Sequence, residues 1–202
     1  GIDEAGRGPL AGPVAVAGIM MSVSYTYYRR YMAYLISNHI LKGIKDSKKL
    51  SAKKREKWAK VLRKKLECHC ALIGPQIIDK IGIQKAARLA TARVLQRFNF
   101  YPDLVLLDGA MSAPKYYNQK TIIKGDEKVP IIAAASIIAK TTRDAKMLRL
   151  HKKFPKYCFD KHKGYGTKLH YKMLKKYGFC SLHRRSFCRN LKARNIATIQ
   201  NL

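Results

Sequence analysis

Short apolar runs of strand length recur along the chain, separated by turns and by longer stretches with a helical period. Residues 1–4 and 13–21 are apolar and rich in residues that favour strands, with a glycine-rich turn between them. Residues 104–107 form a continuous apolar run, and shorter runs lie at 70–73 and 121–123. The pattern therefore predicts a sheet of about five strands.

The longer stretches carry apolar residues at spacings of three and four, which is typical of helices with one buried face. Serine and threonine are good N-caps, proline suits a first helical turn, and glycine often follows a helix end. These signals predict helices that begin after Ser51, cover about 83–98, extend from Pro130 to about 150, and lie between Thr167 and Gly178.

The order of these elements predicts an α/β fold in which helices flank a mixed β-sheet. Nothing in the sequence repeats and no Ser/Gly-rich linker divides it, so we expect a single domain over residues 1–202. Residues from about 150 to 202 are expected to form a C-terminal helical portion that binds substrate. Residues 22–41 are rich in tyrosine; a packed surface hairpin or helix is favoured, and an aromatic stacking surface is the alternative.

The charge balance narrows the range of partners. The chain has 42 Lys and Arg against 12 Asp and Glu, a formal net charge of +30, and such an excess attracts polyanions. Nucleic acid and an anionic membrane surface are the two candidates. The basic residues are spread along the chain, and the apolar run at 131–139 ends at Lys140, too soon to span a bilayer. We therefore expect nucleic acid as the partner and no membrane association.

The five cysteines are odd in number and irregularly spaced, at positions 68, 70, 158, 180 and 188. Cys68 and Cys70 fit one face of a strand, but no second pair lies at the spacing of a zinc ribbon. Reduced, structural cysteines are therefore favoured over a metal site. Such cysteines indicate a reducing compartment, and we expect the protein in the cytoplasm.

Four of the 12 acidic residues stand where chemistry is expected. Asp3 and Glu4 end the apolar start of the chain, Asp108 ends the run 104–107, and Asp144 lies on the long predicted helix. A carboxylate at the end of a buried strand is costly unless a cation satisfies it. Divalent metal is the natural occupant, because hard cations prefer oxygen ligands and two such ions can act on a phosphodiester. The alternative is that these acids form salt bridges with the abundant Lys and Arg.

Geometry restricts how these carboxylates can meet. Adjacent residues of a strand point to opposite faces, so Asp3 and Glu4 share a site only if the glycine turn rotates one of them inward. Lys140 lies four residues before Asp144 and four after Ser136, so these three residues of the long helix are expected to share one face.

A series of short motifs, in one order along the chain, resembles ribonuclease HII, a family of type 2 ribonucleases H. The opening segment GIDEAGRGPLAGP, at residues 1–13, resembles the first motif of that family. The resemblance covers residues 1–21 and 42–188. The other matching segments are DSKKLS at 46–51, LDG at 107–109, IKGD at 123–126, AASIIAK at 134–140, RD at 143–144, HKGYGT at 162–167 and HRRSF at 183–187.

The resemblance implies an RNase H-like fold and a metal site at Asp3, Glu4, Asp108 and Asp144, with Mg²⁺ or Mn²⁺ as cofactor and two ions present with substrate. Family members hydrolyse the phosphodiester on the 5′ side of a ribonucleotide, leaving 3′-hydroxyl and 5′-phosphate ends. They act on RNA/DNA hybrids and on single ribonucleotides in duplex DNA, which implies a role in removing ribonucleotides from DNA. The related ribonuclease HIII has Glu at the last of the four positions, where this chain has Asp.

The same resemblance assigns substrate contacts. The backbone of Gly6, Arg7 and Gly8 would read the 2′-hydroxyl near the RNA-to-DNA junction, since glycine lets a backbone approach closely. Tyr165 would stack on the sugar that follows the ribonucleotide. The alternatives are a simple tight turn for the glycines and a buried ring for Tyr165. Candidates for contact with the substrate backbone are Lys48, Lys49, Ser136 and Lys140, although most lysines in so basic a chain are solvated.

Two other classes of function compete with a junction ribonuclease. A basic RNA-binding protein without catalysis, such as a ribosomal component, would bind without metal-dependent cleavage, and the four acids argue against it. Another nuclease on the same fold would cut without needing a ribonucleotide; the resemblance of the Gly6–Gly8 turn and Tyr165 to the family's substrate contacts argues against it. Residues 22–41 are longer than the family pattern and are taken as an insertion. The histidines at 151, 162, 170 and 183 are expected to be structural. We expect a monomer, and the sequence leaves open whether there is a replication partner.

Overall fold

Five strands form one mixed sheet, as the sequence predicts. The computed structural model describes residues 1–21, 41, 44 and 50–189. The strand order across the sheet is β3-β2-β1-β4-β5. The β1–β2 and β2–β3 pairs are antiparallel, whereas β1–β4 and β4–β5 are parallel. The strands are β1 Ile2–Ala5, β2 Val14–Met20, β3 Glu67–Ile73, β4 Val105–Asp108 and β5 Gln119–Ile122.

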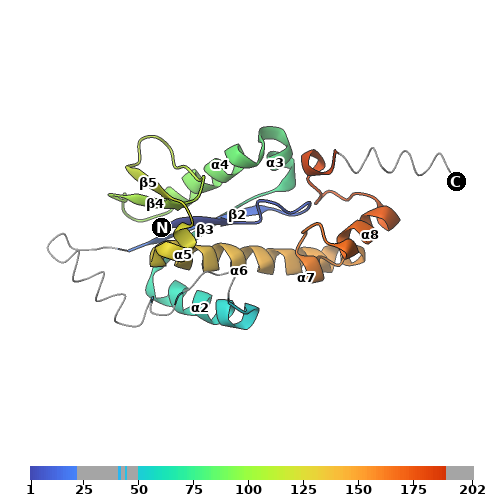
Figure 1. The fold of residues 1–202 in the computed structure, drawn as a ribbon, viewed down its shortest axis with the longest axis horizontal. Helices are drawn as coiled ribbons and strands as arrows, with labels where there is room; N and C mark the ends of the chain where they lie inside the picture. Colours follow the sequence, from blue (N-terminus) through green and yellow to red (C-terminus); the bar gives the residue numbers. More distant parts are fainter. Residues whose placement is uncertain (22–40, 42–43, 45–49, 190–202) are drawn as a thin grey trace.

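Helices cover both faces of this sheet (Figure 1). On one face lie α3 (Pro75–Ile81) and α4 (Ile83–Leu95), and on the other lie α2 (Ala52–Lys65) and α6 (Pro130–Lys153). The short helix α5 (Gly125–Lys128) precedes α6. The elements after α6 are η3 Pro155–Tyr157, α7 Phe159–His162, α8 Lys168–Tyr177 and η4 Arg185–Cys188.

Local sequence signals set the ends of the predicted helices. Ser51 is the N-cap of α2, and its hydroxyl accepts a hydrogen bond from the Lys54 amide at 3.3 Å. Thr167 caps α8 in the same way, accepting from the His170 amide at 3.3 Å, and Gly178 ends that helix with a positive φ. The predicted helices are therefore confirmed, although the second ends earlier than expected. The helices α3, α5 and α7 are too short to show a period in the sequence.

The alternation of side chains along β1 and β2 gives the sheet two apolar faces. Ile2 and Val16 pack with residues of α3 and α4, while Ala17 and Ile19 pack with residues of α2 and α6. Helix α6 contacts both β1 and β2, and its residues 131–139 are all buried. This burial explains why the apolar run in that segment has no polar face. The long helix therefore lies against β1, the strand that carries the first predicted acids.

A third apolar cluster joins the C-terminal elements to the end of α6. Its buried members are Ala11, Met147, Tyr157 and Phe159. Backbone hydrogen bonds tie the loop between β1 and β2 to the same region. The Gly164 carbonyl accepts from the Leu10 amide at 2.9 Å, and the Gly12 amide donates to the Leu182 carbonyl at 2.8 Å. The loop that follows the glycine turn is thereby fixed between the sheet and the C-terminal elements.

Three further expectations concern the chain as a whole. Among the helices of the described residues, none has the length and apolar character that crossing a bilayer requires. The five cysteines are free thiols. The tyrosine-rich segment at 22–41 lies, apart from Leu41, outside the described residues, so its interpretation as an insertion stays a prediction.

Candidate active site at the ends of β1 and β4

Three carboxylates converge where the parallel strands β1 and β4 end. Asp3 lies on β1, Asp108 is the last residue of β4, and Asp126 lies in the short helix α5. One carboxylate oxygen from each lies within 4.8 Å of the other two. Because β1 and β4 are parallel neighbours, their C-terminal ends meet at the same edge of the sheet. The structure therefore brings together two of the four predicted acids and adds a third carboxylate, Asp126.

Asp3 is almost fully buried, with 4% of its surface exposed. Burial raises the pKa of its carboxyl from 3.8 to about 8, and the negative charge of Asp108 adds to the increase. Hydrogen bonds from the Ser136 hydroxyl on α6 and from the Glu4 amide, at 2.7 Å, lower the pKa and offset only part of this rise. The ionised form of Asp3 therefore lacks a compensating positive charge.

Backbone amides of α5 hold Asp108 in position. Its Oδ1 accepts hydrogen bonds from the Gly125 amide at 2.6 Å and from the Asp126 amide at 3.3 Å. A Cβ at Gly125 would lie 2.7 Å from Cδ1 of Ile132 and 3.3 Å from the same Asp108 oxygen, so this approach depends on glycine. The start of α5 consequently supplies both the amides that orient Asp108 and the third carboxylate.

The donor set fits a divalent cation. Carboxylate oxygens are the ligands that Mg²⁺ and Mn²⁺ prefer, and three of them lie close enough to share one ion. Asp3 and Asp126 are 4% and 5% exposed, so water screens their repulsion poorly. A divalent ion bound among these oxygens would offset the negative charge of Asp108, which contributes to the raised pKa of Asp3.

Glu4 lies on the opposite side of β1 from Asp3. Strand β1 stays in regular register with β2 through Ala5, so the alternation of side chains continues past Glu4. The Glu4 Oε1 pairs with Nη1 of Arg7 at 3.3 Å, inside the glycine turn. Its charge still adds to the raised pKa of Asp3, which shows that the two carboxylates remain within electrostatic reach. Among the described residues, the carboxylates within 4.8 Å of one another do not include that of Glu4, and its role as a metal ligand stays a prediction.

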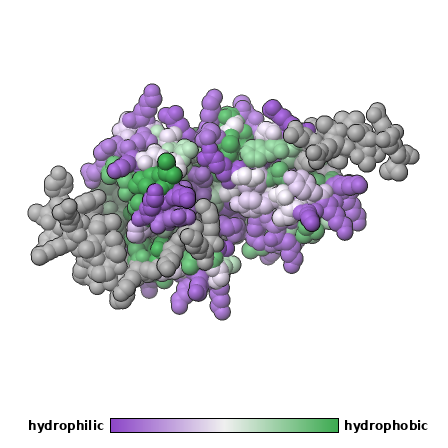
Figure 2. Space-filling model, in the orientation of Figure 1, coloured by the Kyte–Doolittle hydropathy of each residue, from purple (hydrophilic) through white to green (hydrophobic). Residues whose placement is uncertain are grey.

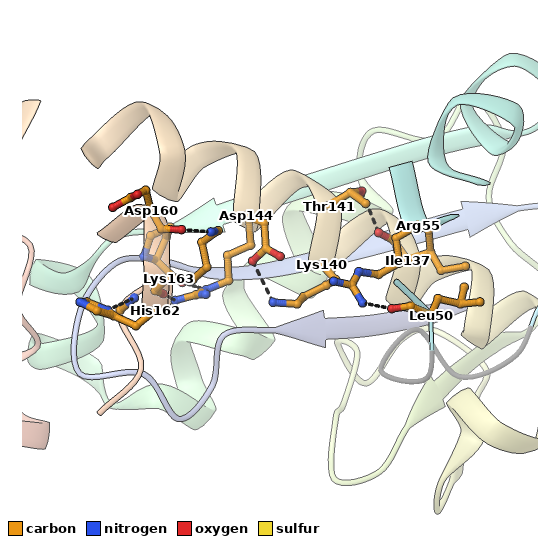
Figure 3. Close-up of polar contacts among 12 residues, drawn as sticks. Leu50, Arg55, Ile137, Lys140, Thr141, Asp144, Asp160, His162 and Lys163 are labelled. Carbon is orange, nitrogen blue, oxygen red and sulfur yellow. Dashed lines mark hydrogen bonds and ion pairs between the residues drawn. The ribbon is translucent and has the colours of Figure 1, made fainter. Parts of the chain in front are cut away.

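Asp144 lies about two helical turns beyond Ser136 on α6. Its Oδ1 pairs with Nζ of Lys140 at 2.8 Å (Figure 3). At roughly 100° per residue, Lys140 is rotated by about 40° from Ser136 around the helix, and Asp144 by about 80°. Asp144 thus turns toward α2, where it lines a cavity of about 270 Å³ together with Arg63. The helix face expected to carry Ser136, Lys140 and Asp144 therefore spans a wide arc. Whether Asp144 joins the Asp3, Asp108 and Asp126 carboxylates stays a prediction.

The glycine turn after β1 is too tightly packed for any other residue at position 6. Gly6 has a φ of +85°, and a Cβ there would lie 1.8 Å from Nε of Arg143. Gly8 is exposed, and a Cβ there would meet no atom within 4 Å. Packing therefore requires glycine at position 6, whereas at position 8 the absence of a side chain leaves the backbone open to a ligand.

Tyr165 is exposed beside α6, so the alternative of a buried ring is wrong. Its exposed fraction is 41%, and its ring centroid lies 5.4 Å from Cζ of Arg143 and 5.9 Å from Nζ of Lys140. Two cations thus contact an aromatic face that solvent can still reach. Of the other predicted contacts, Lys48 and Lys49 lie outside the described residues.

A chain of buried histidines fixes the backbone of Tyr165. Nδ1 of His170 lies 2.9 Å from the Tyr165 carbonyl and therefore donates to it. Nε2 of His170 must then accept from Nε2 of His183, which is 3.1 Å away. Nδ1 of His183 in turn accepts from the Cys180 amide at 2.9 Å. These partners fix one neutral tautomer for each ring, which supports the structural role expected for these histidines.

We expect acid to destabilise this histidine cluster. Burial lowers the pKa of both His170 and His183 from 6.5 to about 4. Between these pH values the unfolded chain binds protons that the folded protein excludes, so stability falls as the pH drops from 6.5 toward 4. Urea denaturation should show that lowering the pH from about 7 to about 4.5 costs the wild-type protein roughly 3 kcal/mol more than the His183→Gln variant.

Titrating groups distant from His183 contribute equally to both proteins and cancel in this comparison, so the difference reports His183 together with its contact to His170. The matched control is His69→Gln on β3, where the half-buried imidazole pairs with Glu67 at 3.0 Å. This control should keep the full loss of stability in acid. The same pH dependence in the wild-type protein and in His183→Gln would contradict the assignment.

Sequence reasoning missed three charged residues at the site: Asp126, Arg143 and Arg184. Asp126 has a signal in the sequence, because it lies next to a glycine shortly after an apolar run. Asp108 also lies next to a glycine at the end of an apolar run. The arginines carry no such signal, since they are two among 42 basic residues. Their complete burial, 0% exposed in each case, is visible only in the structure.

Comparisons with known proteins agree on one family. The family model described as Ribonuclease HII matches residues 1–190. Ribonuclease HII from Caldicellulosiruptor bescii is 42% identical over 192 residues, covering 95% of this chain and 86% of that protein. Ribonuclease H2 from Pyrococcus horikoshii OT3 has a TM-score of 0.73 at 27% identity, covering 96% of this chain and 97% of that chain. The RNase HII structure from the PCNA complex of Archaeoglobus fulgidus has a TM-score of 0.71 at 29% identity, covering 91% and 92%.

The match includes the strand ends and the helix that carry the candidate acids, together with the glycine turn and Tyr165. Proteins of this family act on RNA/DNA substrates and depend on a divalent metal, for which the carboxylate cluster is a suitable site. The chain belongs to the ribonuclease HII family and is an endonuclease of the RNase H type.

Proposed function

We propose that the protein cleaves the phosphodiester on the 5′ side of a ribonucleotide, both in RNA/DNA hybrids and at single ribonucleotides in duplex DNA. The products would carry a 3′-hydroxyl and a 5′-phosphate, and the biological role would be the removal of ribonucleotides from DNA. The observation that carries this proposal is the cluster of Asp3, Asp108 and Asp126 at the end of β1, from which the Gly6–Gly8 turn begins. A carboxylate cluster that could hold a divalent ion thus lies close along the chain to the exposed backbone of Gly8.

The clustered carboxylates would hold a divalent ion, Mg²⁺ or Mn²⁺, and Glu4 and Asp144 would complete a two-ion site when substrate is bound. Such ions activate water and stabilise the charge on a leaving oxygen at a phosphodiester. The protein holds the acids ready for this role. Two backbone amides of α5 orient Asp108, and the hydroxyl of Ser136 contacts Asp3.

Recognition of the ribonucleotide would come from the turn and from Tyr165. The backbone of Gly6, Arg7 and Gly8 would contact the 2′-hydroxyl, the group that distinguishes RNA from DNA. The exposed Tyr165 ring would stack on the sugar that follows the ribonucleotide. Lys140, which lies beside that ring, would contact a phosphate.

General attraction to the duplex would come from the net charge of +30. Hydrophilic residues are spread widely over the coloured part of the face seen in Figure 2, with hydrophobic patches between them. Attraction of this kind is independent of base sequence and weakens as salt increases. Selection of a ribonucleotide therefore has to come from the local contacts at the turn.

The proposal is tested with a labelled DNA duplex that contains one ribonucleotide, incubated with Mg²⁺, with Mn²⁺ or with chelator, beside an all-DNA duplex. We expect metal-dependent nicking on the 5′ side of the ribonucleotide and an intact control. Binding without cleavage in either metal would support the noncatalytic RNA-binding class instead. Cleavage of the all-DNA duplex would support a nuclease that does not need a ribonucleotide.

Removing the Tyr165 ring is expected to reduce cleavage of the single-ribonucleotide duplex. Stacking of a base on an aromatic side chain contributes about 1–3 kcal/mol, and a sugar contact at the lower end of that range means that Tyr165→Ala should lower kcat/KM by roughly tenfold. Tyr165→Phe keeps the ring and should remain close to the wild-type value. Tyr116→Ala is the control, because Tyr116 is also exposed, at 65%, and lies outside the candidate site. Equal rates for Tyr165→Ala and Tyr116→Ala would exclude the sugar contact.

A further inference from the structure

Two arginines lie fully buried behind the glycine turn. Arg143 on α6 and Arg184, the residue before η4, are each 0% exposed. They come from distant parts of the chain, yet both contact the loop that joins β1 to β2. Both donate hydrogen bonds to backbone carbonyl groups of that loop. The conformation of the glycine turn therefore depends on them.

Arg184 binds the turn with all three nitrogens of its guanidinium group. Nη2 donates to the Gly6 carbonyl at 2.7 Å, and Nη1 donates to the Arg7 carbonyl at 2.8 Å. Nε donates to the Gly12 carbonyl at 2.9 Å. The planar fork of the guanidinium matches this set of oxygens, and a lysine ammonium could not span it in the same way.

These bonds determine where the amides of the turn point. In a trans peptide the carbonyl and the following N–H point in opposite directions. When Arg184 holds the carbonyls of Gly6 and Arg7, the N–H groups of Arg7 and Gly8 point away from it. A cation on a carbonyl also polarises the peptide and strengthens its N–H as a donor. The pair of amides is thus preset as donors on the outer side of the turn.

Arg143 links the turn to the exposed tyrosine. Its Nε donates to the Pro13 carbonyl at 3.0 Å and occupies the space that a Cβ at Gly6 would need. Its Nη2 donates to the Lys163 carbonyl at 3.0 Å, two residues before Tyr165. Its Cζ lies 5.4 Å from the centre of the Tyr165 ring. The Arg143 side chain therefore fixes the distance between the glycine turn and Tyr165, the two proposed contacts to the ribonucleotide.

Stability alone does not account for two buried cations in this place. Burial, together with the charge of Arg143, lowers the pKa of Arg184 to about 9, so the charged form is held against a desolvation cost. Replacing buried ionic groups with apolar residues of similar size is often neutral or stabilising in proteins. The arginines donate hydrogen bonds to the backbone carbonyls of this loop, which an apolar residue could not do.

We propose that Arg143 and Arg184 are positioning residues that preset the amides of the Gly6–Gly8 turn for the 2′-hydroxyl of a ribonucleotide. This inference rests on the proposed function of the turn. The arginines do not touch the substrate; they act through the backbone of the turn and, for Arg143, through Tyr165. Their contribution is expected in the preference for a ribonucleotide rather than in general duplex affinity.

The test is a double-mutant cycle between each arginine and the 2′-hydroxyl, measured as binding in chelator, where metal-dependent cleavage is suppressed. Fluorescence anisotropy gives the Kd for a duplex with one ribonucleotide and for the same duplex made of DNA only. Arg184→Lys keeps the charge but loses the fork. We expect the preference ratio of the two Kd values to fall roughly tenfold, with the all-DNA Kd unchanged. The matched control is Arg185→Lys, whose exposed guanidinium lies 4.9 Å from the Phe179 ring and should leave the ratio unaltered.

The outcomes separate this inference from the proposed function. Equal affinity of the wild-type protein for the two duplexes would overturn the proposed role of the turn and the inference with it, whereas the proposed cleavage activity is decided separately by the nicking assay. A wild-type preference that persists in Arg184→Lys would overturn the inference alone. If circular dichroism shows that Arg184→Lys is unfolded, the same two Kd values are measured for Arg143→Lys instead. Loss of the fold in both variants would assign the arginines to stability only and would also overturn the inference.

Discussion

Replacing Asp108 with asparagine is expected to lower the cleavage rate at least about a thousandfold while leaving duplex binding nearly unchanged. Asparagine keeps the size of the side chain and an oxygen that can accept a hydrogen bond from the Gly125 amide. In the wild-type protein this amide lies 2.6 Å from the Asp108 carboxylate. It removes the negative charge that a divalent ion requires. Losing several kcal/mol of charge stabilisation in the transition state accounts for a reduction of this order. Single-turnover cleavage of a ribonucleotide-containing duplex measures it.

The same substitution at Asp103, two residues before β4 begins, provides the control. Asp103 is exposed, and its contact with Asn118 is made by its backbone carbonyl, so Asp103→Asn leaves that contact intact. This variant should cleave at the wild-type rate. Anisotropy in chelator should give similar Kd values for both variants, because general affinity comes from the basic surface. Retained cleavage in Asp108→Asn would remove Asp108 from the active site.

The sequence correctly predicts that Asp3 and Asp108 lie in the candidate site, because both positions follow from local strand patterns. An apolar run that stops at an aspartate indicates a buried strand with a charge near its end; Asp108 is the last residue of β4, whereas β1 continues past Asp3 to Ala5. Parallel pairing of β1 and β4 then brings the two ends together. Helix caps such as Ser51 and Thr167 are local in the same sense, because the residues that interact are three apart in the sequence.

The remainder of the site depends on contacts between distant segments, which a single sequence does not encode in any local pattern. Arg184 binds the Gly6 carbonyl across 178 residues of chain, and no spacing rule indicates such a pair. The side of β1 on which Glu4 lies depends on how far the strand continues. The orientation of Asp144 depends on the rotation of α6 against the sheet. A motif can place these residues at the site by resemblance, but their geometry requires the fold.

The second large effect concerns metal binding at Asp3. We expect the proton on the Asp3 carboxyl and a bound divalent ion to exclude each other. Burial raises the pKa of Asp3 from 3.8 to about 8 in the folded protein. Between these values the folded protein holds a proton that the unfolded chain has lost, so the stability of the metal-free protein falls as the pH rises toward 8. The buried histidines change stability in the opposite direction, but only below pH 6.5. The buried amino group of Gly1, whose pKa burial lowers from 8.0 to about 5, also opposes Asp3 up to pH 8, so comparison with the Asp3→Asn variant isolates the contribution of Asp3.

Binding of a divalent ion in this range must displace the proton from Asp3, because a carboxylate binds metal only when it is ionised. Calorimetric titration with Mn²⁺ in buffers of different ionisation enthalpy should detect about one proton released per site near pH 6.5 and almost none near pH 9. Below pH 8 the apparent affinity should rise about tenfold per pH unit. Asp3→Asn should bind Mn²⁺ more weakly and without proton release. If the wild-type protein released no proton near pH 6.5, Asp3 would already be ionised without metal. In that case its burial could not be the reason that the site requires a cation.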